Sequence, residues 1–268
     1  MKRISKRDLI LEAIIQEYLN SGEPIGSSEL QMKMDIAISP STIRIYLKKL
    51  SDEGALVQLH VSSGRVPTND ALMDYWQSRI NPTRKLAINS LDEIESTIND
   101  YQLFCIAQKS SREFLKEIIE VKDRFLILSF DKNEVVLKYS RQVKGFLSNL
   151  IGCEIRELKK ISAQVGLYEL YDKLHQILSA SAILKAGESE LYRIAKELED
   201  ESFLEQILSS EFTFSLDEGV YFDGFVPSGC MAVKQLATIE KDDAQLLCFG
   251  KIDSDFESFF KQARGKHE

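Results

Sequence analysis

The stretch Ser39–Glu53, SPSTIRIYLKKLSDE, constrains the fold of this chain more than any other part of its sequence. Ser39 is a favourable helix N-cap, and Pro40 suits the first helical turn, where its missing N–H has no intrahelical partner anyway. The stretch therefore predicts a helix with a defined start. At about 3.6 residues per turn, its apolar side chains share one face. They are Ile43, Leu47 and Leu50.

The opposite face of this predicted helix carries cations and hydroxyls, and no acid occurs before Asp52. The residues on or beside it are Ser39, Ser41, Thr42, Arg44, Ile45, Lys48 and Lys49. Hydroxyls and unpaired N–H groups at a helix N-terminus suit phosphate oxygens, and an arginine can fork onto a guanine edge. Ile45 is the exception on this face, and a thymine methyl would explain its exposure. We interpret the stretch as a DNA-recognition helix; use of the same face for protein contacts only is the alternative.

The flanking sequence predicts a small module around this helix. A first helix is expected over 6–20 with Ser5 as its cap, then a Gly/Pro turn, a short helix and a connection at 35–38, which together make a helix-turn-helix. Behind it, two strand-like runs flank a turn at 62–65, as in the hairpin of a winged helix. Gly64 would supply the bend, and Arg65 would reach a phosphate or the minor groove. A further helix is expected from about 69 to the stop at Asn81-Pro82.

The charge distribution agrees with one DNA-binding module on an acidic body. Residues 1–82 hold 10 Lys and Arg against 10 Asp and Glu, so residues 83–268, with 24 against 32, carry the whole net charge of −8. No apolar run reaches the roughly 20 residues that a membrane span needs, and the N-terminus lacks a secretory apolar segment. Four well-separated cysteines without a CxxC pair indicate reduced thiols rather than a metal site. We expect a cytoplasmic protein without a membrane span.

The remainder of the chain predicts an α+β body. Apolar residues recur at three- and four-residue steps over 84–119, which predicts a long helix that either pairs with its copy in a dimer or packs on its own domain. A hairpin is expected over 124–139, helices over 147–165, 167–181 and 189–210, strands over 212–216, 220–226, 231–239 and 245–250, and a last helix over 255–262.

Several of these segments resemble one known family. SGEPIGS, SPSTIR, LKKLSDEGALVQ and especially SSGRVPT are similar to the N-terminal domain of the HrcA family of heat-inducible transcription repressors. LDEGVYFDGFVPSGCMAVKQ and CFGKIDSDFESFF resemble its C-terminal part. The resemblance implies a winged helix-turn-helix at 1–82, a helical linker at 83–120, and a GAF-like α+β domain at 121–268 with an inserted helical dimerisation segment at about 166–210.

The resemblance also implies a function. The protein would bind double-stranded DNA as a homodimer at an inverted-repeat operator, CIRCE, ahead of chaperone genes, with the GroE chaperonin modulating its activity and heat relieving repression. No phosphate-binding loop, nucleophile elbow or paired-histidine motif occurs, so we expect no enzyme activity and no cofactor. The alternative function is a DNA-binding regulator that senses a metabolite through the GAF-like domain. Its pocket would be lined by aromatic residues and a cysteine, whose simpler interpretation is core packing. They are Tyr221, Phe222, Phe225 and Cys230.

Overall fold

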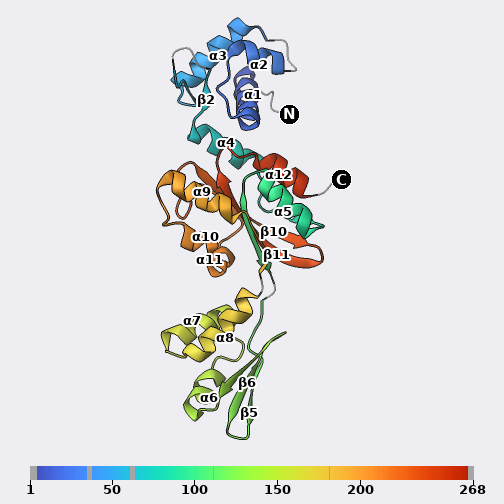
Figure 1. The fold of residues 1–268 in the computed structure, drawn as a ribbon, viewed down its shortest axis with the longest axis vertical. Coiled ribbons are helices and arrows are strands. Elements are labelled where there is room, and N and C mark those ends of the chain that lie inside the picture. Colours follow the sequence, from blue (N-terminus) through green and yellow to red (C-terminus); the bar gives the residue numbers. More distant parts are fainter. Residues whose placement is uncertain (1–4, 35–37, 61–63, 111, 181, 265–268) are drawn as a thin grey trace.

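The computed structural model describes residues 5–34, 38–60, 64–110, 112–180 and 182–264. The chain is α+β, as expected, and its elements form three parts along the long axis of the molecule (Figure 1). An N-terminal helical part lies at one end, a six-stranded sheet with helices on both faces lies in the middle, and a three-stranded sheet with helices lies at the other end.

The N-terminal part contains three helices and a short antiparallel hairpin. These elements are α1 (Lys6–Ser21), α2 (Ser27–Lys33), α3 (Pro40–Asp52), β1 (Leu56–Val57) and β2 (Val66–Pro67). The predicted caps are confirmed, because Ser5 accepts a hydrogen bond from the Asp8 N–H and Ser39 accepts one from the Thr42 N–H. The helices share one apolar core, which includes Ile10 and Ile14 of α1. Residues 35–37 of the expected connection and residues 62–63 of the expected turn lie outside the described residues.

Helix α4 (Asn69–Arg79) joins this part to the central sheet. Its N-cap Thr68 accepts a hydrogen bond from the Ala71 N–H. Trp76 is fully buried, donates through Nε1 to the Ile252 carbonyl at 2.7 Å and packs edge-on against Phe256. Since these contacts reach residues some 180 positions away in the sequence, α4 belongs structurally to the central part as much as to the N-terminal one.

The central sheet has the strand order β3-β10-β11-β4-β8, with β9 also pairing with β10. Its strands are β3 (Leu86–Ile88), β4 (Phe104–Lys109), β8 (Ala182–Ala186), β9 (Gly219–Tyr221), β10 (Cys230–Ile239) and β11 (Asp242–Lys251). Helices α4, α5 (Leu91–Asp100) and α12 (Phe256–Ala263) cover one face, and α9 (Glu188–Leu198), α10 (Leu204–Leu208) and α11 (Ser210–Ser215) cover the other. Because both faces are covered, six consecutive residues of β10 are buried, from Cys230 to Gln235.

The long helix expected over 84–119, and with it the helical linker at 83–120, is wrong. The segment instead forms β3, α5 and β4 and then enters a further strand. The reason lies in the run Phe104–Ala107, where every side chain is at most 1% exposed because the strand has neighbours on both faces. An apolar run of this kind has the same pattern in a buried strand and in a buried helix, so its period could not distinguish them.

The third part is inserted between β4 and β8. It consists of the antiparallel strands β5 (Glu117–Val121), β6 (Phe125–Ser129) and β7 (Glu134–Lys138) and the helices α6 (Arg141–Ser148), α7 (Ile155–Gln164) and α8 (Tyr168–Ser179). The helices cover one face of this sheet, around a core of its own that includes Leu126, Leu128 and Leu174. The hairpin expected over 124–139 is confirmed.

The extent expected for the insertion, about 166–210, is therefore wrong. Strand β8 pairs with β4 in the central sheet, and α9 and α10 pack on that sheet. The segment 212–216, expected as a strand, is α11, which starts at its N-cap Ser209. Helix and strand signals alone did not show which elements share a core, because only β4–β8 pairing marks where the chain returns to the central sheet.

Candidate nucleic-acid interface

Helix α3 has one buried and one exposed face. Ile43, Leu47 and Leu50 are at most 4% exposed and pack in the N-terminal core. The side chains of Ser39, Ser41, Arg44, Ile45, Lys48 and Lys49 are exposed, and Thr42 is partly exposed. Figure 1 places this helix in the N-terminal part, at the end of the molecule farthest from the insertion. The predicted division of the helix into an apolar and a cationic face is therefore present in the structure.

The N-terminus of α3 carries a group of three hydroxyls. The Ser39 hydroxyl accepts from the Thr42 N–H at 3.2 Å, and it lies 2.9 Å from the hydroxyls of both Ser41 and Thr42. The positive end of the helix dipole and the unpaired N–H groups of the first turn lie at the same place. Together these groups favour an oxygen anion.

Arg44 and Ile45 lie one turn further along the helix. The Arg44 Nε donates to the Ser27 hydroxyl at the start of α2 at 3.1 Å, which ties the guanidinium to the neighbouring helix. Ile45 is 69% exposed, an unusual position for a large apolar side chain. A cation held by a second helix and an apolar side chain beside it can contact base edges and a methyl group.

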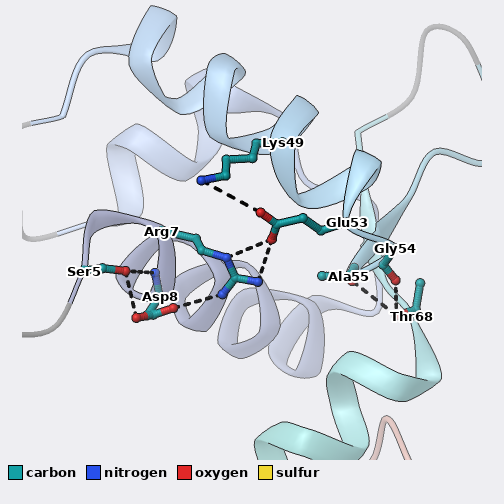
Figure 2. A network of polar contacts seen from close by, with 8 residues as sticks. All are labelled: Ser5, Arg7, Asp8, Lys49, Glu53, Gly54, Ala55 and Thr68. Atoms are coloured by element: carbon teal, nitrogen blue, oxygen red, sulfur yellow. Dashed lines mark hydrogen bonds and ion pairs between the residues drawn. The ribbon is translucent and has the colours of Figure 1, made fainter.

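Lys49 lies at the edge of the cationic face, within a network of ion pairs and hydrogen bonds that connects the C-terminal end of α3 to α1 (Figure 2). Its Nζ is 3.9 Å from Glu53 Oε1, and the other oxygen of Glu53 accepts from Arg7 Nε at 2.8 Å. Arg7 also pairs with Asp8 at 2.9 Å. Hydrogen bonds from Ser5 and then Arg7 hold the pKa of Asp8 below its ordinary value. Lys49 thus shares a carboxylate with Arg7. Lys48 is exposed on the same helix.

Gly64 is required for close packing. A Cβ at Gly64 would lie 2.4 Å from the carbonyl carbon of Ile25, in the loop between α1 and α2. The next residue, Arg65, donates its N–H to the Ile25 carbonyl at 2.9 Å and accepts the Ile25 N–H at 3.0 Å. The sequence suggested a bend at Gly64, but the observed constraint is this approach of two backbone segments.

Arg65 is half-buried at the base of the hairpin. Its Nε donates to the Ser51 hydroxyl, in the last turn of α3, at 2.9 Å. Its backbone bridge and this hydrogen bond connect the hairpin to the α1–α2 loop and to α3. The structure thus brings Gly64 and Arg65 next to the predicted recognition helix.

The residues that support the interface were not found from the sequence. They are Arg7, Ile25, Ser27, Ser51 and Glu53. Ser27 and Arg44 are 17 positions apart, and Arg7 and Glu53 are 46 positions apart. No local pattern links residues at such separations, since helical periodicity relates only neighbours three or four apart.

Three other features of the described part of the chain concern metal binding, membrane-spanning helices and the cysteines. Among the residues that the structure describes, no group of three His, Cys, Asp or Glu side chains could hold a metal ion. In the described part of the chain, the helices are all too short or too polar to cross a membrane. The four cysteines are free thiols, and burial raises the pKa of Cys230 to about 12.

The aromatic residues proposed for a metabolite pocket are packed against other side chains. Phe225 lies 5.4 Å from Tyr221 and 4.9 Å from Phe212, measured between ring centroids, and all three belong to the core under α11 together with Cys230. Phe222 packs against the core on the other face of the sheet. The core-packing interpretation of this set is therefore confirmed.

The sequence of this chain is similar to a family model and to proteins of known name. A family model described as the HrcA C-terminal domain matches residues 76–267. A heat-inducible transcription repressor HrcA of Helicobacter pylori is 32% identical over 259 residues, which cover 96% of this chain and 94% of the relative. One from Alkaliphilus metalliredigens is 29% identical over 248 residues, covering 89% of this chain and 67% of the relative.

Solved structures give weaker similarities. A crystal structure described as a hypothetical protein aligns over 98% of this chain and 97% of its own, with 16% identity and a TM-score of 0.48. An IclR transcriptional regulator from Alicyclobacillus acidocaldarius aligns over 97% and 94%, with 10% identity and a TM-score of 0.27. Scores this low do not establish a common fold.

Proposed function

Because the chain belongs to the HrcA family of heat-inducible transcription repressors, we propose that it represses chaperone operons by binding an inverted-repeat operator of the CIRCE type as a homodimer. In this proposal the N-terminal part is a winged helix-turn-helix that reads DNA, the central part is a GAF-like domain, and the insertion between β4 and β8 brings two copies together. The domain division follows the described elements: a reader up to about residue 80, then the body, interrupted by the insertion at about 112–180.

The observation that carries the DNA-reading role is the exposed face of α3. Arg44 and Lys48 are exposed there, Lys49 lies at its edge, and no carboxylate occurs between Ser39 and Asp52. A positive, solvent-facing helix on a neutral module suits the phosphate-lined major groove. The acidic body limits non-specific attraction to DNA, so we expect binding that weakens steeply as salt increases.

Each residue of this face has a proposed role. Ser39, Ser41 and Thr42 bind a phosphate at the helix N-terminus, where three hydroxyls converge. Arg44 reads a guanine edge, and its hydrogen bond to Ser27 sets the direction of the guanidinium. Ile45 meets a thymine methyl. Lys48 and Lys49 contact the backbone of the duplex.

Gly64 and Arg65 position the hairpin beside α3. Arg65 uses its Nε for Ser51, and the terminal nitrogens of the same guanidinium are the groups proposed to reach a phosphate. Gly64 acts through Ile25, by allowing the hairpin base to approach the α1–α2 loop. The wing contact therefore depends on a network internal to the N-terminal part.

The proposed homodimer uses the open face of the three-stranded sheet. Helices α6 to α8 cover one face, whereas the other exposes Ile119, Phe125 and Val136, each 41–46% accessible. These residues lie on three adjacent strands, and Ile127 lies between Ile119 and Val136 in the pairing register. An apolar sheet face of this kind is stabilised by a second copy through a two-fold axis.

The test of base reading is Arg44→Ala. We expect operator affinity to fall about 5- to 150-fold, equivalent to about 1–3 kcal/mol, measured by fluorescence anisotropy with an inverted-repeat duplex. Arg141→Ala is the matched control, since Arg141 is an exposed arginine on α6 in the insertion and should leave affinity unchanged. Unchanged affinity in a folded Arg44→Ala variant would refute the base-reading role.

The test of the dimer is Phe125→Glu. A carboxylate within the proposed interface should give monomers in sedimentation velocity. It should also weaken operator binding, because the two DNA-reading parts would no longer be linked. Tyr168→Glu is the control, because Tyr168 is 67% exposed on α8, away from the sheet face. A Phe125→Glu protein that stays dimeric would remove this face from the interface.

The proposed link to GroE rests on the family alone. We expect purified repressor to recover operator binding faster after dilution from denaturant when chaperonin and ATP are present than with an equal mass of albumin. Equal recovery in both mixtures would argue against chaperonin-assisted activation. The operator-binding assay at stepped temperatures tests the proposed relief by heat.

A further inference from the structure

A small cavity lies where α4, β10 and α12 meet, on the face of the central sheet that carries the N-terminal part. Its volume is about 130 Å³, and we refer to it as the α4–α12 cavity. The lining residues used below are Arg79, Gln235, Glu257, Phe260, Lys261 and Arg264. At roughly 30 Å³ for each water-sized unit, the cavity has room for about four such units. That is the size of inorganic phosphate or a short carboxylate.

The wall of this cavity contains a buried hydrogen-bond donor without a partner. Gln235 is 2% exposed, and its Nε2 has no hydrogen-bond partner among the described residues. A buried N–H group that gives up its hydrogen bond to water and gains no new partner is destabilising. Native structures therefore normally satisfy such a group with protein, water or a ligand. An acceptor inside the cavity would satisfy this N–H group.

The charge around the cavity indicates which acceptor fits. Arg79, Lys261 and Arg264 are cationic, and Glu257 is the one anionic residue of the lining. The Glu257 carboxylate already accepts from the Tyr75 hydroxyl at 3.3 Å and pairs with Lys261 at 2.8 Å. Positive charges of the lining outnumber negative ones by two, or by one when Glu12, which pairs with Arg79 from outside the lining, is counted. The chain as a whole has a net charge of −8. A local excess of this sign attracts an anion.

We propose that the α4–α12 cavity binds a small oxyanion, with the Gln235 amide as the buried donor and Arg79, Lys261 and Arg264 as the surrounding cations. An oxyanion accepts several hydrogen bonds at once, and guanidinium groups match its geometry. Phe260, which is 6% exposed, supplies an apolar wall that limits access of water to the bound ion. This site lies outside the proposed DNA-binding face and is not needed for it.

The position of Arg79 connects the cavity to the N-terminal part. The Arg79 guanidinium also forms an ion pair with Glu12 of α1, so an anion in the cavity competes with Glu12 for the same cation. A consequence for operator affinity would rest on the proposed function. Binding of the anion itself is measured without DNA. A failure of the anion-binding proposal can therefore be distinguished from a failure of the proposed repressor function.

The test uses inorganic phosphate and acetate as probes on the full chain, with sodium chloride keeping the ionic strength constant. We expect a saturable rise in melting temperature, about 3–5 °C at ten times the dissociation constant. Trp76, the one tryptophan of the chain, is buried three residues before Arg79, so its fluorescence should change with the same dissociation constant. The probe that saturates at lower concentration identifies whether phosphate or a carboxylate is preferred.

Gln235→Glu separates a specific site from a general salt effect. Its carboxylate would occupy the position of the anion among the three cations, so the saturable response should be lost while the variant stays as stable as the parent at pH 7. An equal response in parent and variant would show a general effect of salt and overturn the proposal. No saturable response in the parent would mean that the cavity holds water only, which also overturns it.

A second variant keeps the proposal testable if Gln235→Glu does not fold. Lys261 is 68% exposed, so Lys261→Gln removes one cation of the rim without disturbing the core. We expect it to weaken phosphate binding several-fold. Lys160→Gln, at an exposed lysine of α7 in the insertion, should leave binding unchanged. Unchanged phosphate affinity in Lys261→Gln would overturn the proposed site.

Discussion

Replacing Gly64 by alanine tests how the hairpin is held beside the proposed recognition helix. The added Cβ would lie 2.4–2.6 Å from the carbonyl carbon, oxygen and nitrogen of Ile25. All three are backbone atoms, so the contact cannot be relieved by rotating a side chain. The two segments must move apart, and this breaks the pair of hydrogen bonds between Ile25 and Arg65.

The cost of this change follows from those contacts. Forcing a methyl group into a filled space costs about 1–3 kcal/mol, and each lost backbone hydrogen bond costs about 0.5–1.5 kcal/mol. We therefore expect Gly64→Ala to destabilise the docked hairpin by about 2–6 kcal/mol, for one methyl group and two hydrogen bonds. Even the lower value corresponds to roughly 30-fold faster amide exchange at Ile25 and Arg65, measured by hydrogen–deuterium exchange. Operator affinity should fall with it, although Gly64 has no side chain to contact DNA.

Gly145 provides a matched control for the same substitution. It lies inside α6, and a Cβ there would have no atom within 4 Å. Gly145→Ala should stabilise its helix by about 0.5–1 kcal/mol and leave operator binding unchanged. If Gly64→Ala left the exchange of the Ile25 and Arg65 amides at the parent rate, the argument from close approach would be refuted.

Three further predictions concern the rest of the chain. Burial lowers the pKa of Lys234 to about 8, below its value of about 10.4 in the unfolded chain. Between these two pH values the unfolded state binds more protons than the folded state. The free energy of unfolding should therefore rise from about pH 8 to pH 10. Lys234→Met should remove this rise in thermal unfolding curves; the same rise in the variant would contradict the assignment. Trp76→Phe should lower stability by about 1–3 kcal/mol, because the buried Ile252 carbonyl loses its donor, and an unchanged melting temperature would contradict this. Burial raises the pKa of Cys153 to about 11, so roughly one Cys153 side chain in a thousand is a thiolate at pH 8. Mass spectrometry should therefore show that Cys153 is alkylated far more slowly than free glutathione. Equal rates of alkylation would contradict this prediction.

The recognition helix could be predicted in detail because its information is local. Ser39 caps the helix through a group three residues away, and Ile43, Leu47 and Leu50 lie within two turns of one another. Caps and amphipathic faces depend on spacing along the chain, which the sequence displays directly. The motif SSGRVPT likewise indicates the family to which a relative aligned over 96% of the chain belongs.

The environment of the proposed site residues could not be predicted. The sequence predicts that Arg44 lies on the exposed face, but its hydrogen-bond partner Ser27 belongs to another helix. The sequence predicts a bend at Gly64, whereas the structure shows that the constraint there is the nearby backbone of Ile25. Arg65 likewise has a hydrogen-bond partner, Ser51, that is 14 positions away in the sequence. These contacts depend on how the helices pack, and packing brings together residues that the sequence separates.

By itself, the sequence determined the amphipathic α3, its start, the cationic face and the family. Only the tertiary structure decided that Phe104–Ala107 is a central strand and that the insertion begins after β4. The physical reason is that a strand covered on both faces is a continuous apolar run, and a buried helix segment is one too. The pattern of apolar residues therefore does not distinguish them. Pairing with β11 on one side and β8 on the other, both distant in the sequence, selects the strand.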